Sequence, residues 1–206
     1  MRKLVFVGLL GVIALASTAS ATNPGWVKYR SRHLQFPFSF SHPTEWKARF
    51  AGFIWPPYGE PQYLIVALST ERLHNPNCHA VPQPGGTSTL ECSPILDSLP
   101  PGGVYVEWWE DASASDDPKL TYTPGNVTHV GGALAKIVID PTSKTAGTIC
   151  PKDTTASVQF YIAGTQQPGS PIGRPFVYMY ACTNTTNFPQ FMSQLVPMLR
   201  TVSFRR

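Results

Sequence analysis

Proline is the residue that most restricts how this chain can fold. The 206 residues include 21 prolines, and many of them separate short apolar runs. Because proline fixes φ and lacks an N–H donor, this spacing disfavours long helices and favours short strands joined by loops. Apolar side chains alternate at 36–40 and 104–109, and 63–69 is a continuous apolar run of strand length. The sequence therefore predicts a sheet as the main element.

Two further strand pairs are predicted nearer the C-terminus. A Gly-Gly pair at 131–132 separates the runs 127–130 and 133–139, and glycine accepts the positive φ of a two-residue hairpin turn. The runs 157–162 and 176–182 form the second pair. A loop rich in glycine, proline and glutamine joins its two strands.

One helix is predicted close to the C-terminus. Asn187 and Gln190 fit a capping box, and Pro189 falls in the first turn, where a missing N–H costs little. Pro197 is expected to kink or shorten this helix. Apolar side chains recur at helical spacing along one face: Phe188, Phe191, Met192, Leu195, Val196, Leu199 and Val202. That face is expected to pack on a sheet.

The first 21 residues have the layout of a secretory signal. Arg2 and Lys3 precede the uncharged apolar run 4–16, and the small residues at 19–21 suit a signal peptidase that cleaves before Thr22. The apolar run is shorter than the ~20 residues of a spanning helix, and no later segment is long and apolar enough to span a membrane. We therefore expect a secreted, extracytoplasmic chain.

Composition indicates one domain after the signal, at 22–206. The chain shows no internal repeat and no domain-sized shift in composition, which favours a single α+β domain. Its 16 basic and 12 acidic residues include Arg2 and Lys3, so the mature chain carries a net charge of only +2. Without a basic stripe, the sequence predicts no nucleic-acid partner.

The four cysteines predict two disulfide bonds. An even number of cysteines in an oxidising compartment favours pairing, and three pairings are possible. Cys78–Cys92 with Cys150–Cys182 is favoured because each bond closes the shorter local loop. His74 and His79 lie near Cys78, but a zinc site would need Cys92 to stay reduced outside the cell. We therefore predict neither a metal nor a cofactor.

The acidic residues are too poorly arranged to predict catalysis. They cluster at Glu107, Glu110, Asp111, Asp116 and Asp117, and glycosidases need two carboxylates at a fixed separation. Alternation along a strand places Glu107 away from Glu110. The regular spacing of a calcium loop is also missing.

Nucleophile motifs are missing as well, since no Gly-x-Ser-x-Gly elbow occurs in the chain. The sequence therefore favours a protein that is not an enzyme.

Aromatic residues provide the candidate binding surfaces. Trp108 and Trp109 follow Glu107 in a predicted strand, and Trp55 and Tyr58 flank two prolines. Aromatic side chains beside prolines give rigid contact area of the kind found in binding sites. The competing interpretation of both groups is packing in the core or in loops.

Three segments resemble parts of known proteins. Phe38 to Trp46 resembles the opening strand and turn of PsbP-like domains, and 199–204 resembles their last helix and final strand. Leu99 to Trp109 (LPPGGVYVEWW) is similar to a segment of uncharacterised secreted proteins and lipoproteins of actinobacteria, although their lipid-bearing cysteine is missing here. The resemblance implies an α/β/α sandwich, with a mostly antiparallel sheet flanked by helices, and a non-enzymatic role.

These observations predict a non-enzymatic extracytoplasmic binding or accessory factor with a protein partner in the envelope or outside the cell. The alternatives are a secreted hydrolase that uses Glu107, possibly on glycosides, and a carrier of small molecules or lipids. The sequence does not rank these alternatives, and it does not show whether the glycosylation triplets at Asn126 and Asn184 are used.

The signal assignment predicts the N-terminus of the exported protein. Cleavage after Ala21 should leave Thr22 as the first residue, because the small residues at 19–21 fit the peptidase. N-terminal sequencing and intact mass of protein from the culture fluid measure this. Recovery of the chain only in membranes, with 1–21 attached, would contradict the assignment.

Overall fold

The computed structural model describes residues 25–31, 38–46, 48–55, 62–86, 88–111, 126–140, 150–162 and 176–204. The predicted signal at 1–21 lies outside these ranges. Within them the elements are β1 (Trp26–Arg30), β2 (Phe38–Pro43), β3 (Ala48–Trp55), β4 (Gln62–Ser69), β5 (Cys78–Pro82), β6 (Ser88–Cys92), β7 (Val104–Asp111), β8 (Asn126–Val130), β9 (Ala133–Asp140), β10 (Ala156–Ile162), β11 (Phe176–Thr183), α2 (Phe188–Arg200) and β12 (Ser203–Phe204).

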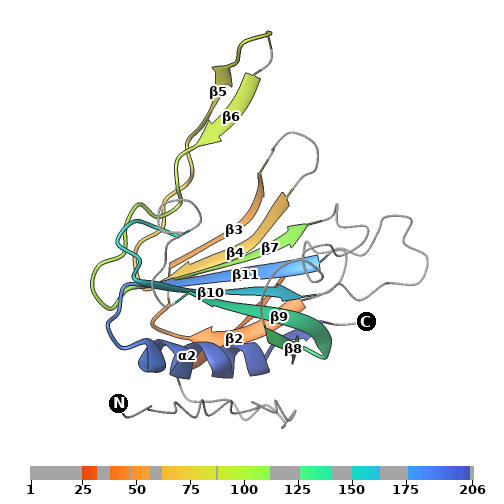
Figure 1. Cartoon of the computed structure of the whole chain (residues 1–206), viewed down its shortest axis with the longest axis vertical. Coiled ribbons are helices and arrows are strands. Elements are labelled where there is room, and N and C mark those ends of the chain that lie inside the picture. The colour runs from red at the N-terminus through yellow and green to blue at the C-terminus, as the bar shows by residue number, and fades with distance from the viewer. Residues whose placement is uncertain are drawn as a thin grey trace, which may run out of the picture.

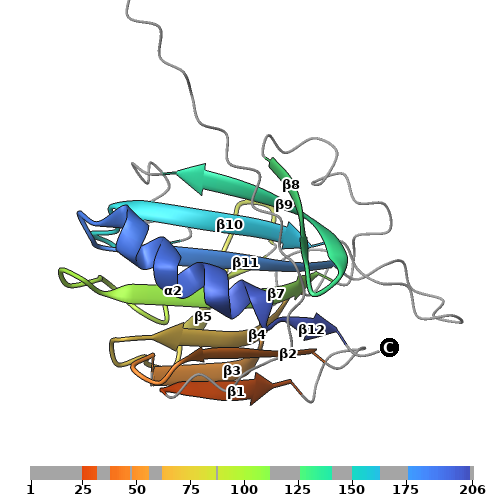
Figure 2. The same cartoon turned by 90° about the horizontal axis from the view of Figure 1, so that it is seen from below.

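The described strands form three antiparallel sheets. The large sheet has seven strands in the order β3-β4-β7-β11-β10-β9-β8, and a smaller one has the order β1-β2-β12. The hairpin β5–β6 pairs only with itself and extends away from the large sheet (Figure 1). Figure 2 shows α2 crossing one face of the large sheet, with β1 and β2 beside it on the same face.

The main core fills the space between the large sheet and this covering layer. Trp108 on β7 is fully buried, and its ring centroid lies 4.9 Å from that of Phe38 and 5.2 Å from that of Phe40, both on β2. The helix adds Leu195 and Met198, which are also fully buried. Alternation along each strand brings these apolar side chains to one face, which is why the layer packs here.

A second, smaller core lies on the opposite face of the large sheet. Leu64 and Ala67 of β4 and Tyr105 of β7 meet the buried side chains of Ile95 and Leu99 there. Ile95 and Leu99 belong to the chain between β6 and β7, outside any helix or strand. Irregular chain therefore covers part of this face.

The expected helix-flanked α/β/α sandwich is wrong. Among the described residues α2 is the only helix, and it covers one face of the large sheet, so the second helical layer of such a sandwich is missing. The segments that cover the other face around Leu99 and Cys150 contain prolines, which oppose helix formation. The described part of the chain is mostly antiparallel β-sheet, with a helix near the C-terminus.

The structure confirms the predicted helix cap and hairpin turn, whereas Pro197 does not shorten the helix. The Asn187 side chain accepts a hydrogen bond from the Gln190 N–H at 3.1 Å and caps α2. The helix continues past Pro197 to Arg200, so this proline does not shorten it. Gly131 and Gly132 adopt φ of 59° and 81° in the turn between β8 and β9.

Both predicted disulfide bonds are formed. Cys78 and Cys92 are direct cross-strand partners in the β5–β6 hairpin, and Cys150 bonds Cys182 of β11 inside the second core. Two disulfides with no free cysteine among the described residues indicate an oxidising, extracytoplasmic environment. No helix in the described ranges has the length and hydropathy needed to cross a membrane.

The core position of Trp108 predicts a large loss of stability on truncation. Trp108→Ala should lower the free energy of unfolding by about 3–5 kcal/mol, because it removes a fully buried ring and leaves a cavity beside Phe38 and Phe40. Urea denaturation measures this. Val127→Ala is the control, since Val127 is 66% exposed and its truncation should change stability by less than about 0.5 kcal/mol. Equal effects of the two variants would contradict the packing.

Candidate functional site

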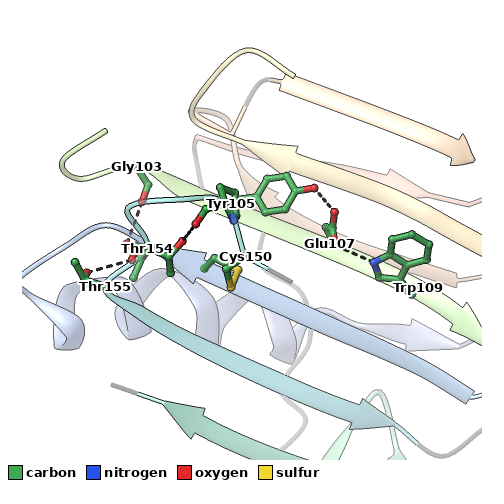
Figure 3. The surroundings of a disulfide bond; sticks show 10 residues. Gly103, Tyr105, Glu107, Trp109, Cys150, Thr154 and Thr155 are labelled. Carbon is green, nitrogen blue, oxygen red and sulfur yellow. Dashed lines mark hydrogen bonds between the residues drawn. A yellow bond between two sulfur atoms is a disulfide. The ribbon is translucent and has the colours of Figure 1, made fainter. Parts of the chain in front are cut away.

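Glu107 is a buried charged residue and the predicted binding residue with a carboxylate. It lies in the middle of β7, and the Tyr105 hydroxyl donates a hydrogen bond to its Oε1. The Trp109 indole N–H donates to its Oε2 at 2.9 Å. Strand alternation places these three side chains on one face of the large sheet, away from α2 (Figure 3). Both carboxylate oxygens of Glu107 therefore have donors from its own strand.

Burial alters the protonation of this group. Removal from water raises the pKa of the Glu107 carboxyl above its ordinary value of 4.5, while the hydrogen bonds from Tyr105 and Trp109 lower it in part. Burial also raises the pKa of Tyr105 well above 10.0, and the nearby charge of Glu107 adds to that shift. Because its pKa is raised, the Tyr105 phenol keeps its proton and donates a hydrogen bond to Glu107.

Further aromatic side chains surround Glu107 on this face. The Tyr178 ring lies nearly parallel to the Trp109 ring, with an interplanar angle of 8° and centroids 6.2 Å apart. Tyr180 is the cross-strand partner of Glu107, and burial raises the pKa of its phenol. On β10 the Tyr161 hydroxyl donates to the side-chain oxygen of Gln159 at 2.8 Å. The face is thus aromatic, with its polar atoms largely paired within the protein.

The carboxylates do not form a glycosidase pair among the described side chains. Glu107 and Glu110 lie three residues apart on β7 and point to opposite faces of the sheet, as alternation predicted. Asp116 and Asp117 lie outside the described residues, as does the side chain of Asp111. No group of three histidine, cysteine, aspartate or glutamate residues in the described part of the chain could hold a metal ion.

Most of the other predicted site residues do not lie beside Glu107 in the described structure. Trp108 lies on the opposite face of the sheet in the main core, where no partner can reach it. Trp109 is partly buried and packs against the second core. Trp55 ends β3, but its side chain is not among the described ones, and Tyr58 lies outside the described residues altogether. Of the five predicted binding residues, the structure therefore shows only Glu107 and Trp109 in contact.

A groove opens beside the second core, and the sequence did not reveal it. It is shallow and open to solvent, has a volume of about 830 Å³, and is named here the Pro100 groove. Four separate parts of the chain line it: Glu71 and Arg72, then Leu96 with 98–101, then 153–155, and finally Asn184.

One wall of the Pro100 groove is the Leu99-Pro-Pro-Gly-Gly segment, which is held rigidly although Pro100 and Pro101 are exposed. The Asn184 side chain donates to the Leu99 carbonyl at 2.7 Å, and the Thr183 hydroxyl donates to the Gly103 carbonyl at 3.0 Å. A Cβ at Gly103 would lie 2.9 Å from the Pro100 oxygen, so the tight turn requires glycine.

The second wall is formed by 153–155, part of the segment 150–155 that lies beside the first wall, and the buried Cys150–Cys182 disulfide ties this segment to the large sheet (Figure 3). Lys152 joins the two walls, because its N–H donates to the Asp97 carbonyl at 2.9 Å and its carbonyl accepts from the Leu99 N–H at 3.0 Å. Next to it Asp153 adopts a φ of 64°, a conformation that aspartate tolerates better than most residues.

The Pro100 groove holds two charged groups without partners. Among the described residues, no hydrogen bond or ion pair involves the Arg72 guanidinium or the Asp153 carboxylate, and both side chains are exposed. Glu71 differs, since its carboxylate accepts a hydrogen bond from the Thr70 hydroxyl at 3.2 Å. One cation and one anion are therefore available to a ligand.

No protein-family model matches the chain, and comparisons with curated proteins and with solved structures also find no match. The class that the structure defines is a disulfide-bonded, mostly antiparallel β protein with a rigid surface groove. Membership of the PsbP-like family stays a prediction.

The sequence contained one indirect sign of the groove. Leu99 to Gly103 stood out as a motif, but it pointed only to a family resemblance. Arg72, Asp153 and Asn184 carry no local pattern, and they meet only because the sheet brings the ends of β4 and β11 together.

The burial of Glu107 predicts how stability depends on pH. The raised pKa means that the folded protein holds this proton more tightly than the unfolded chain, so the contribution of Glu107 to stability falls as pH rises from 4.5 through its folded-state pKa. Glu107→Gln removes this charge. The stability of the variant relative to wild type should therefore be higher at pH 7 than at pH 4, as measured by urea denaturation at each pH. A constant difference would show that the carboxyl titrates normally.

Proposed function

We propose that this protein is a secreted, non-enzymatic binding factor of an extracytoplasmic compartment, and that a partner protein docks in the Pro100 groove. The observation that carries this proposal is the combination of a rigid wall at 99–103 with the unpartnered charges of Arg72 and Asp153. A site that is ordered before binding loses less conformational entropy when the ligand arrives.

Rigidity at an exposed position supports a binding role. Loops that carry no function tolerate motion, whereas Pro100 and Pro101 are exposed and yet fixed by hydrogen bonds on both sides. Two disulfides support the extracytoplasmic location, and the predicted signal at 1–21 supports secretion.

The contacts of Glu107 favour binding over catalysis. Both of its carboxylate oxygens accept hydrogen bonds from side chains of the same strand, and Glu110 points to the other face. A secreted hydrolase that uses Glu107 and a carrier of small molecules or lipids are the competing hypotheses.

Site-specific photo-crosslinking tests the proposal. A photoreactive phenylalanine analogue at Ser98, an exposed residue of the Pro100 groove, should give one discrete protein adduct when the tagged chain is exported by its own cells. The same analogue at Val127, which is exposed on the edge strand β8, is the matched control and should give none.

A structural control shows whether the groove itself is required. Gly103→Ala places a Cβ against the Pro100 carbonyl and should reshape the wall, so the adduct at Ser98 should be lost while circular dichroism shows an intact fold. Equal labelling from Ser98 and Val127, or none from either, would contradict the proposal. Native mass spectrometry and substrate screening would then test the carrier and the hydrolase.

A further inference from the structure

We infer that the Pro100 groove binds an extended peptide segment of the partner protein, and that this peptide carries one acidic and one basic side chain. The acidic side chain pairs with Arg72 and the basic one with Asp153. This inference rests on the function proposed above and assigns the chemistry of its ligand.

The Leu99–Gly103 wall has no free N–H groups that could pair with the backbone of a peptide ligand. Strand addition needs free N–H donors along the receiving chain. Pro100 and Pro101 have none, and the N–H groups of Leu99, Gly102 and Gly103 donate to the carbonyls of Lys152, Asn184 and Pro100. Every N–H of the wall is therefore absent or already used. The wall offers apolar contact but cannot pair with an added strand.

Selectivity must then come from side chains in the groove. The Arg72 guanidinium has no partner in the described structure and presents a planar fork that matches a carboxylate. The Asp153 carboxylate is likewise unpaired and accepts hydrogen bonds from an ammonium or a guanidinium. The ligand that satisfies both groups carries both signs of charge.

The dimensions of the groove favour a peptide over a free amino acid. A volume of about 830 Å³ lies near the upper end of ordinary ligand sites, and the groove is open to solvent. A free amino acid would bury little surface in such a site. An extended peptide can contact the exposed prolines Pro100 and Pro101 as well as the two charged groups.

The ordered wall lowers the conformational-entropy cost of binding. Hydrogen bonds with Asn184 and Lys152 already hold the 97–103 segment, and the Cys150–Cys182 disulfide holds the neighbouring segment 150–155. The protein therefore has little to reorganise, and most of the ordering on binding falls on the peptide.

A random peptide library tests the inference on the mature disulfide-bonded protein. Selection of displayed dodecapeptides should enrich sequences that contain both an acidic and a basic residue. For one enriched synthetic peptide, replacing its acid by the neutral amide should weaken binding to the wild-type protein by about twofold to fivefold, the range for a solvent-exposed ion pair.

Double-mutant cycles assign each charge to its partner. In Arg72→Gln the same replacement of the peptide acid should have no further effect, and in Asp153→Asn the replacement of the peptide base should have none. Asparagine tolerates the positive φ of Asp153, so that variant should keep the backbone. Arg72→Lys keeps the positive charge but loses the planar guanidinium that can donate two parallel hydrogen bonds to a carboxylate. This variant should bind the peptide with an affinity between those of the wild type and Arg72→Gln.

An exposed basic residue far from the groove lining serves as the control. Arg30→Gln on the edge strand β1 should leave peptide affinity unchanged. Additive effects in the cycles, or enriched peptides without charged residues, would overturn the inference. If Ser98 crosslinks to a partner while the cycles show no coupling, the proposed function stands and only the peptide chemistry fails. An adduct with a polysaccharide would overturn both.

Discussion

The packing of Trp108 between the large sheet and β2 is the contact on which the rest of the structure depends. Phe38 and Phe40 reach this ring from the small sheet, and α2 closes the same layer. β12 near the C-terminus pairs with β2, so Phe204 lies opposite Phe38. Both ends of the described chain must therefore reach this face before the core is complete, since a seven-stranded sheet cannot leave such a face exposed to water.

The other face of the sheet is covered differently, and this difference creates the Pro100 groove. Irregular chain around Leu99 and the disulfide-tied segment at 150–155 cover only part of that face. Loops expose more of their backbone than helices do, so hydrogen bonds from Asn184 and Thr183 have to hold them. The same bonds that satisfy the backbone also fix the shape of the groove.

Local patterns predicted local structure well. The turn at 131–132, the cap at Asn187 and the two disulfides follow from conformational preference and sequence spacing, which act between near neighbours. The α/β/α sandwich failed because it came from resemblance. Nothing in the helical periodicity supports a second helical layer, and loops around Leu99 replace it.

The sequence by itself determined the chain's strand-rich character, the C-terminal helix and the shared face of Glu107 and Trp109, because these depend on neighbouring residues or on a period of two or 3.6 residues. It favoured one of three possible cysteine pairings, which the structure confirms. Only the tertiary structure decided which face became the core, so it alone buried Trp108. It alone also assembled the Pro100 groove, because Arg72, Asp153 and Asn184 meet through sheet order, which no short stretch of sequence encodes.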